Sequence, residues 1–220
     1  MYCVFTFLGL GLTLFAINCF LPGLRGRRQV AGAFARLFLR VTGIPLLIEG
    51  CEALPAQPCV VVANHASYID GIVAIAALPP DFAFVIKKEM VKVPLAGFLL
   101  RRLGSEFVER FDRRQGAADA RRVMKLAATG QSLVFFPEGT FGPVREINQF
   151  HAGAFKIAAR LTLPVVAVAI HGTREVLPAG GAFVFRQPIR FQILGTMPAE
   201  GARERSRLMI AEAVGEPLAS

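Results

Sequence analysis

From about Leu46 onwards, short apolar runs rich in β-branched residues alternate with stretches that favour helices. The expected strands are Cys59–Ala63, Phe82–Ile86, Glu106–Val108, Leu133–Phe136, Val165–Ile170 and Ile189–Ile193. The expected helices are Tyr68–Ala77, Pro94–Leu103, Gly116–Thr129, Ala152–Leu161 and Ala199–Val214. Strands that are apolar on both faces and separated by helices are typical of a buried, mostly parallel sheet. The pattern therefore predicts an α/β fold with a mixed, largely parallel sheet flanked by helices.

The segment before this alternation begins with 24 residues that carry no charged side chain. At about 1.5 Å of rise per residue, a helix of that length reaches across a hydrocarbon core of roughly 30 Å. A secretory signal would place its basic residues before the apolar run, whereas Arg25, Arg27 and Arg28 follow it here. We expect a membrane-associated segment that either spans the bilayer or lies in the interface as one arm of a helical hairpin.

The next segment has the pattern of a basic amphipathic helix. Its apolar stripe consists of Val30, Phe34, Leu37, Phe38 and Val41. Arg28, Arg36 and Arg40 are expected on the other side, either near lipid phosphates or solvated on a helix that packs on the domain. We therefore divide the chain into an N-terminal membrane-associated region, residues 1–45, and a catalytic domain, residues 46–220. If the first segment spans, the positive-inside rule places that domain on the cytoplasmic face.

The chain is both basic and apolar, with 25 Lys and Arg against 16 Asp and Glu, and 54% hydrophobic residues. This combination suits membrane association or nucleic-acid binding. No RNA-binding or DNA-binding motif is apparent, and the aromatic residues are mostly Phe within apolar runs, so we expect no nucleic-acid partner. The four Cys lack the close pairs that structural zinc requires, so we expect no metal.

A histidine and an aspartate come just after an apolar strand, within Asn64–Asp70. In α/β folds, sites lie at the carboxyl ends of strands. His65 is suited to act as a general base, and Asp70 to orient it and stabilise the imidazolium. The spacing suits this pair only if His65 lies on a loop and Asp70 in the first turn of a helix. From these two residues alone, helix capping by Asn64 and His65 is the favoured interpretation.

Three further segments carry groups of interest. Arg110 ends a short predicted strand and can bind phosphate through two N–H groups, although from this residue alone a surface ion pair with Asp112 is the favoured interpretation. Glu138, Gly139 and Thr140 follow another strand, and a Glu directly after an apolar run favours a functional role. Residues 163–170 are most simply a buried strand.

These segments together resemble the glycerolipid acyltransferase family, which includes bacterial 1-acyl-glycerol-3-phosphate acyltransferases. The resemblance covers about Leu46 to Leu177 and rests on four ordered blocks, NHASYID, GSEFVER, FPEGT and LPVVAVAI. The stretch FHAGAF at residues 150–155 also looks like a segment of the family. A His and an Asp five residues apart are a weak signal alone, but their coincidence with FPEGT in the expected order and spacing is a strong one.

The resemblance implies acyl transfer from a thioester, acyl-CoA or acyl-carrier protein, to the free hydroxyl of 1-acyl-glycerol-3-phosphate, with no further cofactor. It implies that His65 deprotonates the acceptor hydroxyl, which attacks the thioester directly, and that Asp70 orients His65. It implies that Arg110 holds the acceptor phosphate. Glu138, Gly139 and Thr140 would help shape the acceptor site. The residues expected to support the site are Asn64, Ser67, Lys88, Arg145 and Lys156. The expected partners are membrane lipids, the lysophospholipid acceptor and the acyl donor.

One departure from the family bears on the acceptor. The third block often ends in Arg, and this chain has Phe141 instead, so Arg145 or Lys156 would have to replace a phosphate contact. Another lysophospholipid, or another lipid hydroxyl or amine, therefore stays open as the acceptor. A serine hydrolase using Ser67 lacks the G-x-S-x-G elbow, and a metal hydrolase using the three His fits no standard ligand spacing. A basic membrane-surface module explains the charge but not the blocks.

Overall fold

The computed structural model describes residues 2–109, 113–181 and 184–219. Its strands are β1 (Leu46–Glu49), β2 (Val60–Ala63), β3 (Phe82–Lys87), β4 (Glu106–Val108), β5 (Ser132–Phe135), β6 (Val165–His171) and β7 (Ile189–Met197). Its α-helices are α1 (Tyr2–Phe20), α2 (Leu24–Val41), α3 (Asp70–Ala77), α4 (Ala96–Arg102), α5 (Arg113–Ala128), α6 (Gly153–Arg160), α7 (Thr173–Val176) and α8 (Ala202–Val214). Two 3₁₀ turns are η1 (Cys51–Ala53) and η2 (Lys88–Lys92).

The described strands form one sheet in the order β1-β7-β6-β2-β5-β3-β4. β2 pairs in parallel with β5 and β6, and β3 pairs in parallel with β4 and β5. β7 is antiparallel to β6, and β1 joins the edge parallel to β7. The predicted α/β fold with a mixed, largely parallel sheet is therefore confirmed. Because β2, β3, β5 and β6 run the same way, their carboxyl ends meet at one edge of the sheet.

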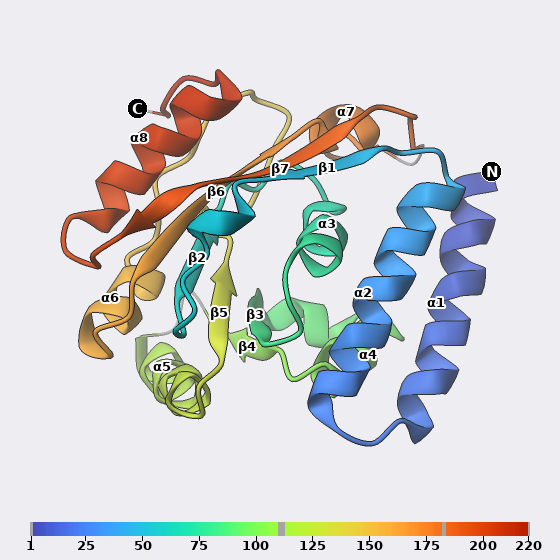
Figure 1. The fold of residues 1–220 in the computed structure, drawn as a ribbon, viewed down its shortest axis with the longest axis horizontal. Coiled ribbons are helices and arrows are strands. Elements are labelled where there is room, and N and C mark those ends of the chain that lie inside the picture. The colour runs from blue at the N-terminus through green and yellow to red at the C-terminus, as the bar shows by residue number, and fades with distance from the viewer. Residues whose placement is uncertain (1, 110–112, 182–183, 220) are drawn as a thin grey trace.

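Helices cover both faces of the sheet (Figure 1): α5, α6 and α8 lie on one side, and α3 and α2 lie on the other, with α1 outermost. The central strand β2 is fully buried and divides its side chains between the two faces. Val61 and Ala63 join the apolar cluster under α2 and α3, and Val60 and Val62 join the cluster under α5, α6 and α8.

The six strands expected from the sequence are all present, with ends that shift by at most four residues. Two short elements were not anticipated, the strand β1 (Leu46–Glu49) and the helix α7 (Thr173–Val176), each four residues long. Among the described residues β1 pairs with β7 alone, at the edge of the sheet; Leu47 is exposed and the other three residues of β1 are half-buried. Such a segment acquires its strand conformation from its partner and carries little local signal.

The apolar stripe predicted for α2 coincides only in part with its buried face. The residues of this helix that are buried are Arg28, Ala31, Gly32, Ala35, Phe38 and Leu39. Leu37 and Val41, from the predicted stripe, are 42% and 41% exposed. Small residues decide the orientation, because a Cβ at Gly32 would lie only 3.2 Å from the carbonyl oxygen of Ile75 in α3. The helix therefore packs on the domain, and an interfacial role for its exposed apolar residues stays a prediction.

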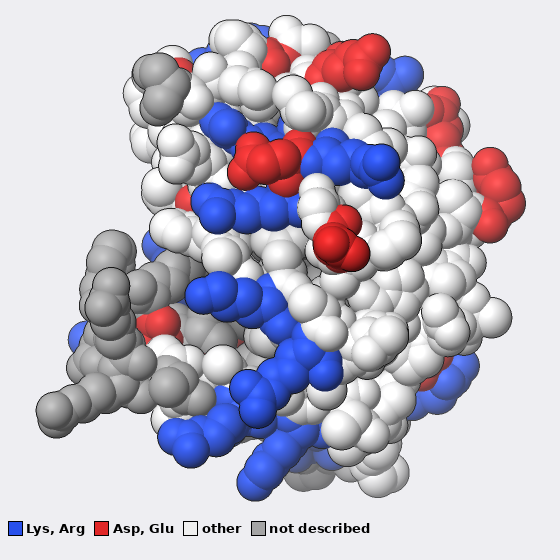
Figure 2. Space-filling model, turned by 90° about the vertical axis from the view of Figure 1, so that its left-hand side faces the viewer, with Lys and Arg blue, Asp and Glu red and all other residues white. Residues whose placement is uncertain are grey.

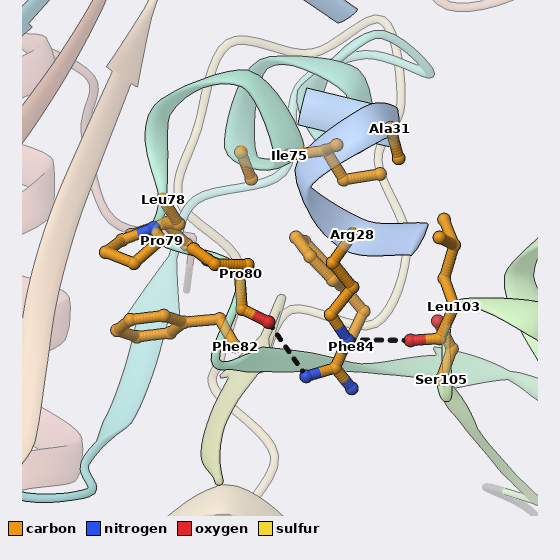
Figure 3. A pocket seen from close by; sticks show the side chains of 11 residues that line it. Arg28, Ala31, Ile75, Leu78, Pro79, Pro80, Phe82, Phe84, Leu103 and Ser105 are labelled. Carbon is orange, nitrogen blue, oxygen red and sulfur yellow. Dashed lines mark hydrogen bonds between the residues drawn. The ribbon is translucent and has the colours of Figure 1, made fainter. Parts of the chain in front are cut away.

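Arg28 was expected to point away from the packed face, and it is instead buried between α2 and the body of the domain. Its Nε donates to the carbonyl oxygen of Leu103 at 2.8 Å, and its Nη1 donates to that of Pro80 at 3.2 Å (Figure 3). A cavity of about 20 Å³ lies beside it, against α3 and β3. Burial lowers the pKa of this guanidinium, and Asp81 opposes that shift. Arg28 therefore fastens α2 to the loops that flank β3 and β4.

Within the described residues, no helix combines the length and the apolar character needed to cross a membrane. The helices α1 and α2 form a hairpin, in which the rings of Phe7 and Phe38 meet edge to face at 5.6 Å. The proposed division of the chain at residue 45 stays a prediction.

Candidate active site

The site lies at the edge of the sheet where the parallel strands end. His65 follows β2, and Glu138 follows β5, the neighbour of β2 in the sheet. The backbone N–H of His65 donates to the Oε1 of Glu138 at 2.7 Å, so the two blocks are in direct contact. Crevices at this edge are where open α/β sheets bind ligands.

His65 and Asp70 form a hydrogen-bonded pair. The Nδ1 of His65 lies 2.8 Å from the Oδ2 of Asp70. His65 lies on the loop after β2 and Asp70 is the first residue of α3, as the spacing required. The same Oδ2 accepts the backbone N–H groups of Ala66 at 2.7 Å and Ser67 at 2.8 Å. A carboxylate oxygen that accepts from these donors requires hydrogen on Nδ1, which leaves the Nε2 lone pair to receive a proton.

The two side chains differ sharply in exposure. The side chain of Asp70 is fully buried, whereas 21% of the His65 side chain is exposed. Asp70 also lies in the field of the first turn of α3, which favours a negative charge. The carboxylate is therefore held in place by the protein, and the imidazole is left accessible to a substrate.

Glu138 is a buried carboxylate whose two oxygens both accept hydrogen bonds from the chain. Oε2 accepts the backbone N–H of Asn148 at 2.9 Å and its side-chain Nδ2–H at 3.2 Å, while Oε1 accepts from His65. Burial raises the pKa of Glu138, and the hydrogen bonds from His65 and Asn148 lower it in part. Glu138 thus fixes the backbone of the histidine loop. Its expected part in shaping the acceptor site stays a prediction.

Two aromatic rings contact the imidazole of His65. Phe136 stacks on it with centroids 4.7 Å apart, and Phe141 meets it edge to face at 4.5 Å. Phe141 also meets Tyr68 edge to face at 4.8 Å. The residue that stands where the family often has Arg therefore packs directly against the proposed base.

Two of the supporting residues have structural contacts. Asn64 is buried and exchanges two hydrogen bonds with the backbone of Ile170 in β6, at 2.8 and 2.9 Å. The hydroxyl of Ser67 donates to the carbonyl oxygen of Leu177 at 2.7 Å. Both residues tie the histidine loop to the adjacent β6–α7 segment. A hydroxyl held in this way also does not fit the nucleophile of a serine hydrolase.

The other predicted binding residues are more dispersed. Arg110 lies outside the described residues. Arg145 forms an ion pair with Glu175 at 2.7 Å, and both side chains are well exposed. Lys88 is exposed in η2 after β3, and Thr140 is exposed in the loop after β5.

Lys156 lies on the rim of a cavity of about 510 Å³ between β3, β5, α5 and α6. Gly139 and Pro137 of the FPEGT block also line this cavity, as do the apolar side chains of Val123 and Ile157. Figure 2 shows that Lys and Arg gather on the face that carries α5 and α6. The exposed basic residues of these two helices include Arg121, Arg122, Lys125, Lys156 and Arg160.

Residue patterns missed some of the site. Phe136 belongs to the FPEGT block, but no pattern indicated that its ring stacks on His65. Asn148, and Arg174, which donates to the carbonyl oxygen of Gly142 at 2.6 Å, lie outside the recognised blocks and had no signal of their own. In the part of the chain that the structure describes, no three His, Cys, Asp or Glu side chains gather as metal ligands.

The fold and the site together define an α/β protein with a pair of a buried aspartate and a partly exposed histidine at the carboxyl edge of the sheet. The sequence profile of the family described as Acyltransferase matches residues 46–171, more than half of the chain. The chain belongs to this family. The matched range contains the histidine loop, the FPEGT block and β6.

Comparison with individual relatives is more specific than the match to the family profile. The chain is 34% identical over 161 residues to a chloroplastic 1-acyl-sn-glycerol-3-phosphate acyltransferase of Brassica napus, covering 71% of this chain and 46% of the relative. It is 28% identical over 167 residues to the 1-acyl-sn-glycerol-3-phosphate acyltransferase of Pseudomonas aeruginosa, covering 76% of this chain and 64% of that protein. The chain thus spans about half to two-thirds of these curated relatives.

A solved structure shares the fold. It is the crystal structure of the 1-acyl-sn-glycerophosphate (LPA) acyltransferase PlsC from Thermotoga maritima, with a TM-score of 0.73 and 22% identity. The match covers 94% of this chain and 92% of that one, so it includes the N-terminal helices as well as the sheet.

Proposed function

We propose that this chain transfers a fatty acyl group from a thioester donor, acyl-CoA or acyl-carrier protein, to the free hydroxyl of 1-acyl-glycerol-3-phosphate, which makes phosphatidic acid. The His65–Asp70 pair, at 2.8 Å and within the range that the family profile matches, carries this proposal. The relatives from Brassica napus and Pseudomonas aeruginosa, both 1-acyl-sn-glycerol-3-phosphate acyltransferases, support the proposed acceptor.

In the proposed reaction Asp70 accepts the Nδ1–H of His65, and the Nε2 of His65 takes the proton of the acceptor hydroxyl. The hydroxyl oxygen forms a bond to the thioester carbonyl carbon as the carbonyl π electrons move to oxygen. When the carbonyl re-forms, the C–S bond breaks and the thiolate takes the proton from Nε2. A positioned general base contributes about 10²–10⁴-fold to such a step, and holding both substrates together supplies much of the rest.

The cavity beside the FPEGT block adjoins the pair through Phe136, which lines it and stacks on His65, and its surface suits an amphiphilic substrate. The cavity of about 510 Å³ has apolar walls and a rim that carries Lys156 and Arg160, which suits an acyl chain attached to an anionic head. Arg110 is proposed to hold the acceptor phosphate, and Glu138, Gly139 and Thr140 to help shape the acceptor site.

A second acceptor class has one observation in its favour. Phe141 packs on His65 at 4.5 Å, in a position where the family often carries Arg. An aromatic ring there offers an acceptor no charge, so another lysophospholipid or lipid acceptor is the alternative. A basic membrane-surface module without activity is the non-enzymatic alternative, and any measured acyl transfer that depends on His65 would exclude it.

An acceptor screen tests the proposed function. Purified protein is mixed with labelled acyl-CoA or acyl-carrier protein and with lysophosphatidate, lysophosphatidylcholine or no acceptor. We expect labelled phosphatidic acid to form fastest. Transfer confined to lysophosphatidylcholine would contradict the proposed acceptor, and transfer confined to a monoacylglycerol, added as a phosphate-free acceptor, would also contradict the role of Arg110. Rapid loss of the thioester without acceptor would indicate a thioesterase instead.

The membrane is the proposed location of the reaction, with residues 1–45 in contact with it. The cytoplasmic face stays a prediction. Protease accessibility of the catalytic domain in intact spheroplasts and in inverted vesicles would check it. A cytoplasmic domain is protected in the spheroplasts and cleaved in the inverted vesicles.

A further inference from the structure

The outward face of α1 is a continuous apolar stripe. Residues 5, 8, 12 and 15 fall on one side of the helix, at spacings of three, four and three. Phe5 is 64% exposed, Leu8 49% and Leu12 53%. The opposite side of the helix contains the buried residues Leu14 and Asn18 and faces the body of the protein. α1 thus presents large apolar side chains to the surroundings.

This stripe continues onto α4. The ring of Phe15, at the end of the stripe, lies 4.7 Å from the ring of Phe98 in α4, and Phe98 is itself 40% exposed. Arg102, in the last turn of α4, donates from Nη2 to the carbonyl oxygen of Asn18 at 2.6 Å and from Nε at 3.0 Å. The two helices are therefore fastened together, and their exposed apolar residues form one surface.

The turn before α4 extends the same surface. Val93 is 43% exposed and Leu95 is 47% exposed. Leu95 has a φ of +58°, a backbone conformation that is costly for a leucine. The turn is tight as well, because a Cβ at Gly97 would lie 2.5 Å from the carbonyl oxygen of Val91. The fold therefore holds two large apolar side chains at the surface of a constrained turn.

The position and charge of this turn point to a lipid surface. The turn follows β3, whose carboxyl end shares an edge of the sheet with that of β2, so it lies on the same edge as His65. Lys92 directly precedes Val93, and Arg101 lies in the last turn of α4; both are exposed. Exposed apolar side chains with basic neighbours suit insertion between the headgroups of anionic lipids.

We propose that Val93, Leu95 and Phe98 form a second membrane contact, which continues the α1 stripe and turns the His65 edge of the sheet towards the surface of a bilayer that contains anionic lipid. The inference rests on the proposed lipid acceptor, because it explains how a membrane-embedded lysophospholipid reaches the histidine. The proposed membrane-contacting surface thus includes a part of the catalytic domain as well as the N-terminal region.

The absence of Trp from the sequence makes the test direct, since any introduced Trp is the only one. Leu95→Trp places the reporter on the turn. Leu208→Trp is the matched control, because Leu208 is 56% exposed on α8, away from this surface. Val93→Trp serves as a second reporter should Leu95→Trp fail to fold. Fluorescence is recorded with phosphatidylcholine vesicles, with and without phosphatidylglycerol, and with brominated lipids as quenchers.

We expect the emission of the turn reporters to shift to the blue with phosphatidylglycerol vesicles and to be quenched by brominated lipid, while the α8 control stays unchanged. Leu95→Ser should weaken vesicle binding about tenfold, and Leu208→Ser should not change it. The proposal is overturned if the turn reporters do not respond on vesicles that bind the protein, or if the α8 control responds equally. A blue shift that depends on protein concentration without vesicles would show that a second copy of the chain covers the surface instead.

Binding and catalysis are measured separately. Vesicle binding needs no substrate, and acyl transfer to lysophosphatidate in detergent micelles needs no bilayer. If the wild-type protein shows no acyl transfer in micelles, the proposed function is contradicted. If it is active in micelles but the turn reporters do not respond to vesicles, only the second membrane contact is contradicted.

Discussion

The buried carboxylate of Glu138 accepts the backbone N–H of His65 across 2.7 Å and the N–H groups of Asn148 on its other oxygen. Two blocks that lie more than 70 residues apart in the chain are thereby joined. The carboxylate faces protein donors with both oxygens, so its main effect is on the position of the histidine loop. Its effect on catalysis should follow from that position.

Glu138→Gln keeps the shape but replaces one acceptor oxygen by an amide that meets the donors of His65 or Asn148. We expect kcat to fall about 10–100-fold with little change in the KM for lysophosphatidate, because misplacement of a base by about 1 Å costs about that much. Steady-state kinetics check this, with the exposed Glu204 of α8 changed to Gln as the control. A rise in KM with unchanged kcat would instead show that Glu138 contacts the acceptor.

The same carboxylate should affect stability in a pH-dependent way. Burial raises the pKa of Glu138 above its ordinary value of 4.5. The folded state then holds this proton more tightly than the unfolded state, so the group costs stability as pH rises from about 4.5 through the folded pKa. The free energy of unfolding of the wild type, minus that of Glu138→Gln, should therefore fall across this range. Urea denaturation at a series of pH values measures it, and a difference that rises with pH would contradict the assignment.

Phe141→Arg tests the choice of acceptor. A guanidinium in this loop, beside His65, would attract the phosphate of lysophosphatidate more than the zwitterion of lysophosphatidylcholine. We expect the ratio of kcat/KM for these two acceptors to rise about tenfold, and the gain to shrink at high salt. Phe141→Leu keeps the position apolar and should leave the ratio near that of the wild type. An unchanged ratio in Phe141→Arg would mean that the acceptor head does not reach this loop.

Arg28→Met tests the attachment of the N-terminal helices. The change leaves the carbonyl oxygens of Leu103, Pro80 and Gly104 without their donor in a buried place. We expect a loss of about 2–4 kcal/mol in the free energy of unfolding, measured by urea denaturation. Arg25→Met, which removes an exposed ion pair with Asp81, should cost less than about 1 kcal/mol. Equal effects of the two changes would show that Arg28 is not a specific anchor.

Local patterns were sufficient for much of the fold and for the core of the site. The apolar run before Asn64 placed His65 at a strand end, and the spacing to Asp70 correctly required a loop followed by a helix start. Both features depend on a few adjacent residues. The strand ends and the FPEGT turn were predictable for the same reason.

Contacts between distant segments were not predictable. The burial of Arg28 depends on carbonyl groups of residues 80 and 103, and the small residues that set the face of α2 match α3 rather than a local period. Likewise, Asn148 gains its role only because the fold brings it to Glu138. Hydrogen bonds of this kind have no sequence spacing that could be read from one chain.

The central claim is that the Nε2 of His65, oriented by Asp70, removes the proton of the acceptor hydroxyl. The most direct test is the initial rate of phosphatidic acid formation from lysophosphatidate and a labelled acyl thioester, for folded His65→Ala and Asp70→Asn proteins. We expect His65→Ala to lose at least about 10²-fold in kcat, and Asp70→Asn to lose a comparable factor because the wrong tautomer is held. His171→Gln, at the end of β6, should retain most of the activity. Transfer at the wild-type rate by His65→Ala would contradict the proposed mechanism outright.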